Sequence, residues 1–132
     1  MNITVDTDIL IDFSLDKDKI LTELFVRQSR KEVNLKINPI IIAEFLTDQN
    51  LKSNKTKEEK AFQLLHFFEC IDITAKEGIL AARFLREKRT PFLSDALIAA
   101  SCLLNDFQLA TRNRKHFGKV PHLQFYSPKR KY

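Results

Sequence analysis

The stretch Ile3-Thr-Val-Asp-Thr-Asp-Ile-Leu-Ile-Asp-Phe13 decides how the rest of the chain is interpreted. Its first three residues are apolar or β-branched, which is typical of a short buried strand. Asp6 follows at once, and Asp6 or Thr7 can cap the helix expected from Asp8 to Phe13. In an open α/β sheet, ligands bind outside the carboxyl ends of the strands. The sequence therefore places a carboxylate where a site would form, although capping explains a lone Asp there equally well.

Length and composition indicate one globular domain, 1–132, with a loose basic tail at 127–132. The chain is 44% hydrophobic and 30% charged, which is ordinary for a soluble protein. It has no apolar run long enough to span a bilayer and no basic-then-apolar signal segment, so we expect a cytoplasmic protein. Cys70 and Cys102 stand in apolar surroundings and predict buried, reduced thiols rather than a disulfide framework or a metal site.

Charge and glycine content narrow the function classes. The formal net charge of +5 fits a polyanionic partner, and it fits a solvated basic surface equally well. The chain has only two glycines, Gly78 and Gly118, and neither belongs to a Gly-rich phosphate loop. Walker-type and dinucleotide-binding sites are therefore excluded.

Strand and helix patterns alternate along the chain. Strands are expected at 3–5, 33–37, 70–74, 108–111 and 123–126. Helices are expected at 8–13, 19–31, 38–46, 58–69, 76–88 and 95–105. Asn38 is expected to cap the helix at 38–46, and Ser94 the helix at 95–105. A loop is expected at 48–57 and a basic turn at 112–117. This alternation predicts an α/β fold with a mainly parallel sheet and helices on both faces.

Three acids are expected at one edge of this sheet. Asp6 ends the first strand, Glu44 lies within an apolar helical run, and Asp95 opens a helix with an apolar stripe. We expect their side chains to point towards packing rather than water. Alternatives exist for each residue alone, since Glu44 can be an ordinary exposed helix residue and Asp95 can favour the helix dipole.

A cluster of carboxylates is costly unless a cation neutralises it. Carboxylate oxygens without cysteine or converging histidine suit Mg²⁺ or Mn²⁺ rather than Zn²⁺. One or two such ions can activate water and hold phosphoryl oxygens for in-line attack. Thr111 and Asn113 come at the end of the fourth strand and can hold a water or a phosphate there.

Three basic residues lie beside that threonine and asparagine: Arg112, Arg114 and Lys115. Alone they are explained equally well as a solvated basic turn. Beside an acidic metal site they are candidates for contacts to a phosphate backbone.

Four blocks of the sequence together resemble the signature blocks of the PIN domain family. They are Val5-Asp-Thr-Asp-Ile-Leu-Ile-Asp12, Asn38-Pro-Ile-Ile-Ile-Ala-Glu-Phe45, Ser94-Asp-Ala-Leu-Ile-Ala-Ala100 and Leu109-Ala-Thr-Arg-Asn-Arg-Lys-His-Phe117. They occur in the family's order and span the chain, which is most similar in pattern to the VapC-type toxins of bacterial toxin–antitoxin pairs. The resemblance implies an α/β/α sandwich with Mg²⁺- or Mn²⁺-dependent endoribonuclease activity. It also implies a homodimer and a small antitoxin that fills the active-site groove.

By position, Asp6, Glu44 and Asp95 match the family's acidic metal ligands, and Thr111 matches its fourth-block threonine. Many members carry a fourth acid where this chain has Asn113 or, three residues on, a histidine. A neutral amide oxygen attracts a divalent ion less than a carboxylate does, which weakens the case for a second tightly held ion. The resulting hypothesis is hydrolysis of RNA phosphodiester bonds by metal-activated water, with Thr111 and Asn113 positioning water or phosphate.

Three other functions fit the sequence less well. A haloacid-dehalogenase-type phosphatase would use Asp6 as nucleophile and Asp8 as acid/base, but its lysine block and its later acid pair are missing. A PIN-like scaffold that binds RNA or a partner without cutting would have no need of the acidic cluster. A metal-free ribonuclease with two histidines is not indicated, because the three histidines show no convergent spacing.

Overall fold

The computed structural model describes residues 1–128. Its strands are β1 (Asn2–Val5), β2 (Asn34–Ile37), β3 (Glu69–Cys70) and β4 (Gln108–Ala110). Its helices are α1 (Thr7–Ser14), α2 (Ile20–Ser29), α3 (Pro39–Leu46), α4 (Lys55–Leu65), α5 (Ala75–Arg86), α6 (Leu93–Asn105) and α7 (Arg114–Phe117), with a 3₁₀ turn, η1 (Gln49–Leu51). No helix within these residues is long and apolar enough to cross a membrane.

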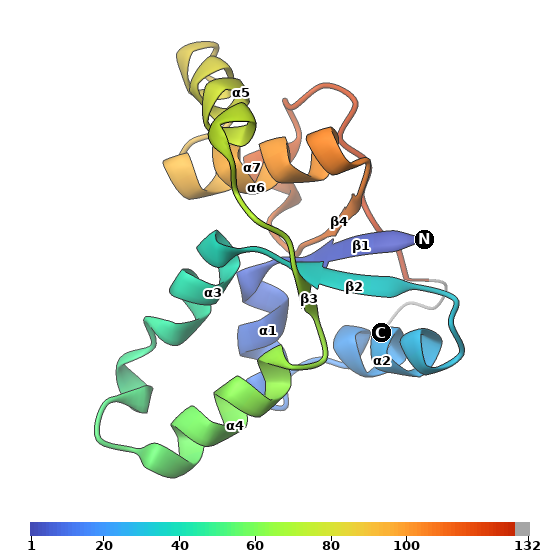
Figure 1. Cartoon of the computed structure of the whole chain (residues 1–132), viewed down its shortest axis with the longest axis vertical. Coiled ribbons are helices and arrows are strands. Elements are labelled where there is room, and N and C mark those ends of the chain that lie inside the picture. The colour runs from blue at the N-terminus through green and yellow to red at the C-terminus, as the bar shows by residue number, and fades with distance from the viewer. Residues whose placement is uncertain (129–132) are drawn as a thin grey trace.

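The four strands form one parallel sheet in the order β3-β2-β1-β4. Ile3 pairs with Leu35 of β2 on one side and with Gln108 of β4 on the other. Figure 1 shows α5 and α6 on one side of the sheet and α1, α2 and α4 on the other. The predicted α/β sandwich with a parallel sheet is confirmed. Because the strand order reverses beside β1, the crevice that binds ligands in such sheets opens between the carboxyl ends of β1 and β4.

Apolar strand residues form the centre of the core. The side chains of Ile3, Val5, Leu35 and Leu109 are at most 1% exposed. Strands covered by helices on both faces bury nearly every side chain, which explains their continuous apolar runs. The core thus fixes β1 and β4 rigidly, and with them the residues that follow each strand.

Two predicted strands are wrong in extent. Residues 123–126 make only a bridge between Leu109 and Phe125, although Tyr126 N donates to Leu109 O at 2.9 Å. β3 ends at Cys70 rather than at residue 74, because Thr74 is the N-cap of α5 and forms a capping box with Glu77. In both cases the residues have a strand-like pattern, but the neighbouring strand β4 or helix α5 determines the structure that they adopt.

Two predicted helix starts are also corrected. α6 begins at Leu93 with Phe92 as N-cap, so Ser94 lies inside the helix. α4 begins at Lys55 within the stretch expected to be a loop, because the Asn54 side chain accepts a hydrogen bond from Lys57 N at 3.1 Å. The Asn38 cap is confirmed, since its side chain accepts from Ile41 N at 3.0 Å.

The cysteine prediction is half right. Both thiols are free, and Cys102 is buried, but Cys70 is exposed because β3 lies at the edge of the sheet. The predicted loose tail lies outside the described residues from 129 onwards.

Candidate active site

Asp6 lies at the carboxyl end of β1 and is held from two sides. Its side chain caps α1, with Oδ1 accepting a hydrogen bond from Thr7 N at 2.8 Å. Its Oδ2 accepts from the Thr111 hydroxyl at 2.7 Å, and its backbone N donates to Ala110 O at 2.9 Å. Asp6 is 6% exposed. The cap interpretation and the site interpretation of Asp6 are therefore compatible, because one oxygen caps the helix and the other faces the β4 side of the crevice.

Burial and, after it, neighbouring acids raise the pKa of the Asp6 carboxyl group. Burial, followed by the negative charges of Asp8 and Glu44, raises the pKa of Asp6 to about 7. Burial also raises the pKa of Asp8, and burial with the charges of Glu44 and Asp8 raises the pKa of Asp95. Four carboxylates thus share one electrostatic environment at the edge where β1 and β4 end.

Glu44 reaches this edge from α3. Its Oε1 accepts a hydrogen bond from the Thr7 hydroxyl at 2.8 Å. The expectation that Glu44 points into packing is wrong, because the residue is exposed at the rim of the crevice while Ile41 and Phe45 of the same helix are buried. An exposed acid held by a hydroxyl remains accessible to an incoming cation.

Asp95 lies in the first turn of α6 and is partly buried. Its Oδ2 lies 3.2 Å from Nδ1 of His116, which comes from α7. The His116 ring in turn contacts the Phe92 ring edge-on, with centroids 5.7 Å apart. Asp95 is therefore oriented by a histidine that sequence spacing does not associate with it.

Thr111 and Asn113 follow β4 as predicted. The Thr111 hydroxyl donates to Asp6 and accepts a hydrogen bond from Asn113 N at 3.0 Å. Asn113 contributes its backbone to this contact, and its exposed side chain makes no hydrogen bond within residues 1–128. The amide side chain is thus free to meet a water or a phosphate.

Arg112 is occupied by internal partners. Its guanidinium contacts the carboxylates of Asp12, at 2.8 Å, and Asp18, whose side chain is only 5% exposed. Its backbone N donates to Asp8 Oδ2 at 3.0 Å. Arg112 therefore joins the segment after β4 to α1 and the α1–α2 connection.

Arg114 is occupied as well, whereas Lys115 is not. The Arg114 guanidinium donates to Tyr126 O at 3.1 Å and to the Ser127 hydroxyl at 2.9 Å, and it lies 5.0 Å from the centre of the Phe125 ring. Lys115 lines a pocket beside the acidic cluster. Of the three basic residues predicted to contact RNA, Lys115 alone has its charged group without an internal partner in the described part of the chain.

Three residues at the site are missed by the sequence argument: Thr7, Asp8 and His116. In the sequence, Asp8 fits only the acid/base position of a phosphatase motif. The signal for Thr7 and Asp8 was their position in the first turn of a helix that starts at the ligand-binding edge. His116 stands at one of the two positions expected for a fourth acid, but its contact with Asp95 is not predictable from the sequence, because it depends on how α7 packs on α6.

The donor set suits a hard divalent cation. The cluster offers carboxylate oxygens, and Asp8 Oδ1 is buried without a hydrogen-bond partner in residues 1–128. In that same range, no three acidic, histidine or cysteine side chains already stand close enough together to hold a metal ion. The raised pKa values of Asp6, Asp8 and Asp95 show carboxylates that a cation would stabilise in their charged form. The chemistry fits Mg²⁺ or Mn²⁺, and binding would require the side chains to move closer together.

The sequence was compared with protein families and with proteins of known function. Residues 3–123 match the model of the PIN domain. The chain is 25% identical over 132 residues to "Ribonuclease VapC" of Rickettsia bellii and 24% identical over 132 residues to "Ribonuclease VapC1" of Rickettsia felis, each match covering 94% of both chains.

Solved structures with the same fold include two toxin–antitoxin complexes. A chain of VapBC2 from Rickettsia felis, bound to a promoter DNA fragment, aligns with a TM-score of 0.79 at 23% identity, covering 96% of this chain and 98% of that one. A chain of DNA-bound VapBC from Salmonella typhimurium aligns with a TM-score of 0.79 at 18% identity, covering 96% and 97%. At this identity the likeness concerns the fold.

Proposed function

Because the chain belongs to the PIN domain family, we propose that it is a divalent-metal-dependent endoribonuclease and the toxin of a VapC-type toxin–antitoxin pair. The observation that carries this proposal is the group of Asp6, Asp8, Glu44 and Asp95 at the crevice between β1 and β4, with the pKa of Asp6 raised to about 7. The curated relatives named ribonuclease VapC support the activity. No observation favours a phosphatase or a non-catalytic scaffold.

Asp6, Glu44 and Asp95 would hold the cation, with Asp8 supplying further negative charge. When bound, Mg²⁺ or Mn²⁺ activates water and neutralises charge on the phosphate. Residues of the chain orient these ligands. Thr111 and Thr7 fix the orientations of Asp6 and Glu44 through their hydroxyls.

Two further groups shape the site. His116 holds Asp95 from the α7 side, and the free amide of Asn113 is placed to orient a water or a phosphate oxygen. Lys115 provides an unpaired cation for the RNA backbone beside the cluster. Arg112 and Arg114 act on the RNA only if they leave their internal partners.

The proposal includes partners. Solved structures with this fold include VapBC and FitAB complexes, which supports an antitoxin protein as the cognate partner. We propose further that the toxin is a homodimer that acts in the cytoplasm.

The test is cleavage of a mixed RNA panel by protein freed of any co-purified partner, with Mg²⁺ and with EDTA. Glu44→Gln and Asp95→Asn should abolish cutting. Glu59→Gln is the matched control for Glu44→Gln, because Glu59 is another exposed glutamate on a helix, α4, far from the cluster in sequence. Cutting that survives EDTA and both site variants would refute the metal-dependent mechanism.

A further inference from the structure

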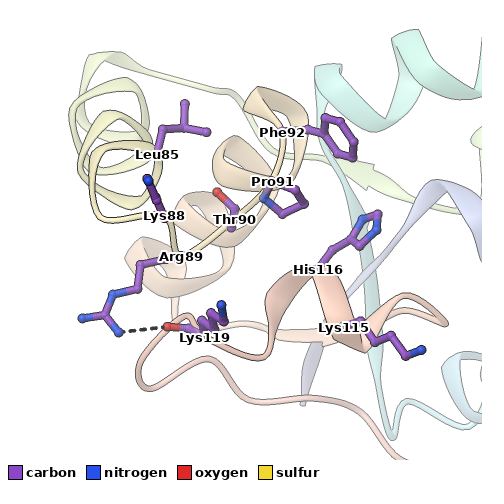
Figure 2. Close-up of a pocket in the computed structure, with 9 residues that line it drawn as sticks. All are labelled: Leu85, Lys88, Arg89, Thr90, Pro91, Phe92, Lys115, His116 and Lys119. Carbon is purple, nitrogen blue, oxygen red and sulfur yellow. Dashed lines mark hydrogen bonds between the residues drawn. The ribbon is translucent and has the colours of Figure 1, made fainter.

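A basic pocket lies beside the acidic cluster. It is a cavity of about 600 Å³ between the end of α5, the segment that leads into α6, and α7. Its basic and aromatic lining consists of Lys88, Arg89, Phe92, Lys115, His116 and Lys119 (Figure 2). This pocket was not indicated by the sequence, because its residues come from two segments some twenty-five positions apart.

The pocket carries positive charge that the protein does not neutralise. Within residues 1–128, no carboxylate pairs with the ammonium groups of Lys88, Lys115 or Lys119. Arg89 is partly engaged, since its Nε lies 3.3 Å from Glu87 Oε1 and its Nη1 donates to Lys119 O at 3.4 Å (Figure 2). Three free cations around one cavity attract a ligand with several negative charges.

An exposed aromatic ring accompanies these cations. Phe92 is 58% exposed although it precedes a well-packed helix. A single exposed phenylalanine needs no explanation. A ring beside a cluster of lysines is different, because single-stranded nucleic acids are bound by cations that follow the phosphates and by aromatic rings that stack on the bases.

The pocket is continuous with the candidate active site. His116 lines the pocket and also lies 3.2 Å, Nδ1 to Oδ2, from Asp95. Phe92 contacts the same histidine ring and lies three residues before Asp95 on the chain. His116 and Phe92 thus connect the pocket to the acidic cluster.

We propose that this pocket binds the phosphate groups of single-stranded RNA next to the bond that is cut, with Phe92 stacking on a base. This inference rests on the proposed ribonuclease function. It means that the RNA substrate extends from the active site into the pocket. An acidic peptide would match the charge, but it brings a ring to Phe92 only where its sequence holds an aromatic residue, whereas every nucleotide of RNA carries a flat base. RNA supplies both the charges and the rings.

Binding is measured by fluorescence anisotropy with a short fluorescein-labelled single-stranded RNA of mixed sequence. The protein carries Asp6→Asn, so that the RNA is bound without being cut. In this background, the pocket variant carries both Lys88→Gln and Lys119→Gln. The control variant carries both Lys55→Gln and Lys60→Gln, which remove the same charge from exposed positions on α4. Thermal unfolding of each variant confirms that the fold is intact.

The pocket variant should bind RNA roughly ten-fold more weakly. The slope of log K against the logarithm of the salt concentration should also be shallower by about 1.4, which corresponds to two lost phosphate contacts. The α4 control should change little. Phe92→Ala should weaken binding by at least about five-fold, whereas Phe62→Ala, at another exposed phenylalanine, should not.

The outcomes separate the two proposals. If the unmodified protein cuts RNA but the pocket variant binds like its parent, or no more weakly than the α4 control, the pocket inference is wrong and the ribonuclease proposal stands. If RNA is neither cut by the unmodified protein nor bound by Asp6→Asn, both are wrong. If polyglutamate binds in a manner sensitive to the pocket lysines and RNA does not, the pocket belongs to a protein partner.

Discussion

The hydroxyl of Thr111 donates a hydrogen bond of 2.7 Å to Oδ2 of Asp6, joining residues that are 105 positions apart. The two residues follow β4 and β1, which are neighbours in the sheet. The same hydroxyl accepts a hydrogen bond from Asn113 N, so its proton is directed at the carboxylate. This contact lowers the pKa of Asp6 against the effect of burial, and it fixes the direction of the remaining lone pairs.

Replacing Thr111 by valine should therefore impair the reaction more than it impairs the fold. Valine keeps the shape but removes the donor, so Asp6 binds a proton more tightly and a cation less well. We expect single-turnover RNA cleavage to fall by about ten-fold or more, as for other residues that orient metal ligands. Thr111→Ser retains the hydroxyl and should retain most of the rate. Equal rates for the valine and serine variants would show that the hydrogen bond is irrelevant to catalysis.

Asp6→Asn should stabilise the metal-free protein near neutral pH. Since the pKa of Asp6 is raised from 3.8 to about 7, the folded chain binds this proton more tightly than the unfolded chain. The resulting stabilisation is complete below about pH 4 and is lost as the pH rises to 7. Asparagine stays neutral and still caps α1. In EDTA, the variant should unfold at a higher temperature than the parent above pH 7, and the difference should shrink towards pH 4.

Two comparisons make this experiment specific. Asp72→Asn, at an exposed acid, should not show the pH-dependent difference. Mg²⁺ should raise the unfolding temperature of the parent above pH 7, because it binds the folded state, and should have less effect on Asp6→Asn. A stability difference that is the same at both ends of the pH range would contradict the buried, proton-binding carboxylate.

The sequence predicts the positions of Asp6 and Thr111 because both follow apolar strands, and parallel strands deliver their carboxyl ends to one edge. It predicts the sheet for the same reason. The exposure of Glu44 was not predictable, since helical spacing groups residues on a face without saying where that face leaves the core. The contact of His116 with Asp95 was equally hidden, because it depends on the packing of α7 against α6.

The failed strand at 123–126 shows a different limit. Its apolar alternation is genuine, but β4 has only three residues, and Leu109 alone bridges to Phe125. Strand formation depends on the length of the partner as much as on the segment's own pattern.

Arg112 is expected to stabilise the fold rather than bind RNA. Its guanidinium contacts Asp12 and the nearly buried side chain of Asp18. Arg112→Gln leaves Asp18 without its cation and should lower the free energy of unfolding by about 2 kcal/mol. Adding Asp18→Asn should restore part of this loss, which a double-mutant cycle in urea would measure. Unchanged stability together with weakened RNA binding would instead support the contact to RNA predicted from the sequence.

Asp106→Gly should stabilise the protein without affecting activity. Asp106 ends α6 in the left-handed conformation, with φ 58° and ψ 46°, while Phe107 N donates to Cys102 O at 2.8 Å. Because φ is positive at Asp106, its Cβ is close to the following carbonyl oxygen, and its carboxylate also meets the negative end of the helix dipole. We expect a gain of about 1 kcal/mol in urea unfolding, from the removal of both effects.

Asp106→Asn separates these two contributions, because it removes the charge and keeps the side chain. If the asparagine variant accounts for the whole gain, the helix dipole is responsible and the backbone is unstrained. If glycine adds a further increment, the left-handed conformation is the larger cost. Asp106→Ala is the opposing control, since alanine is poorly suited to positive φ and should gain less than glycine. Asp106 precedes β4, at the end of the strand opposite Thr111, so RNA cleavage should be the same in all three variants.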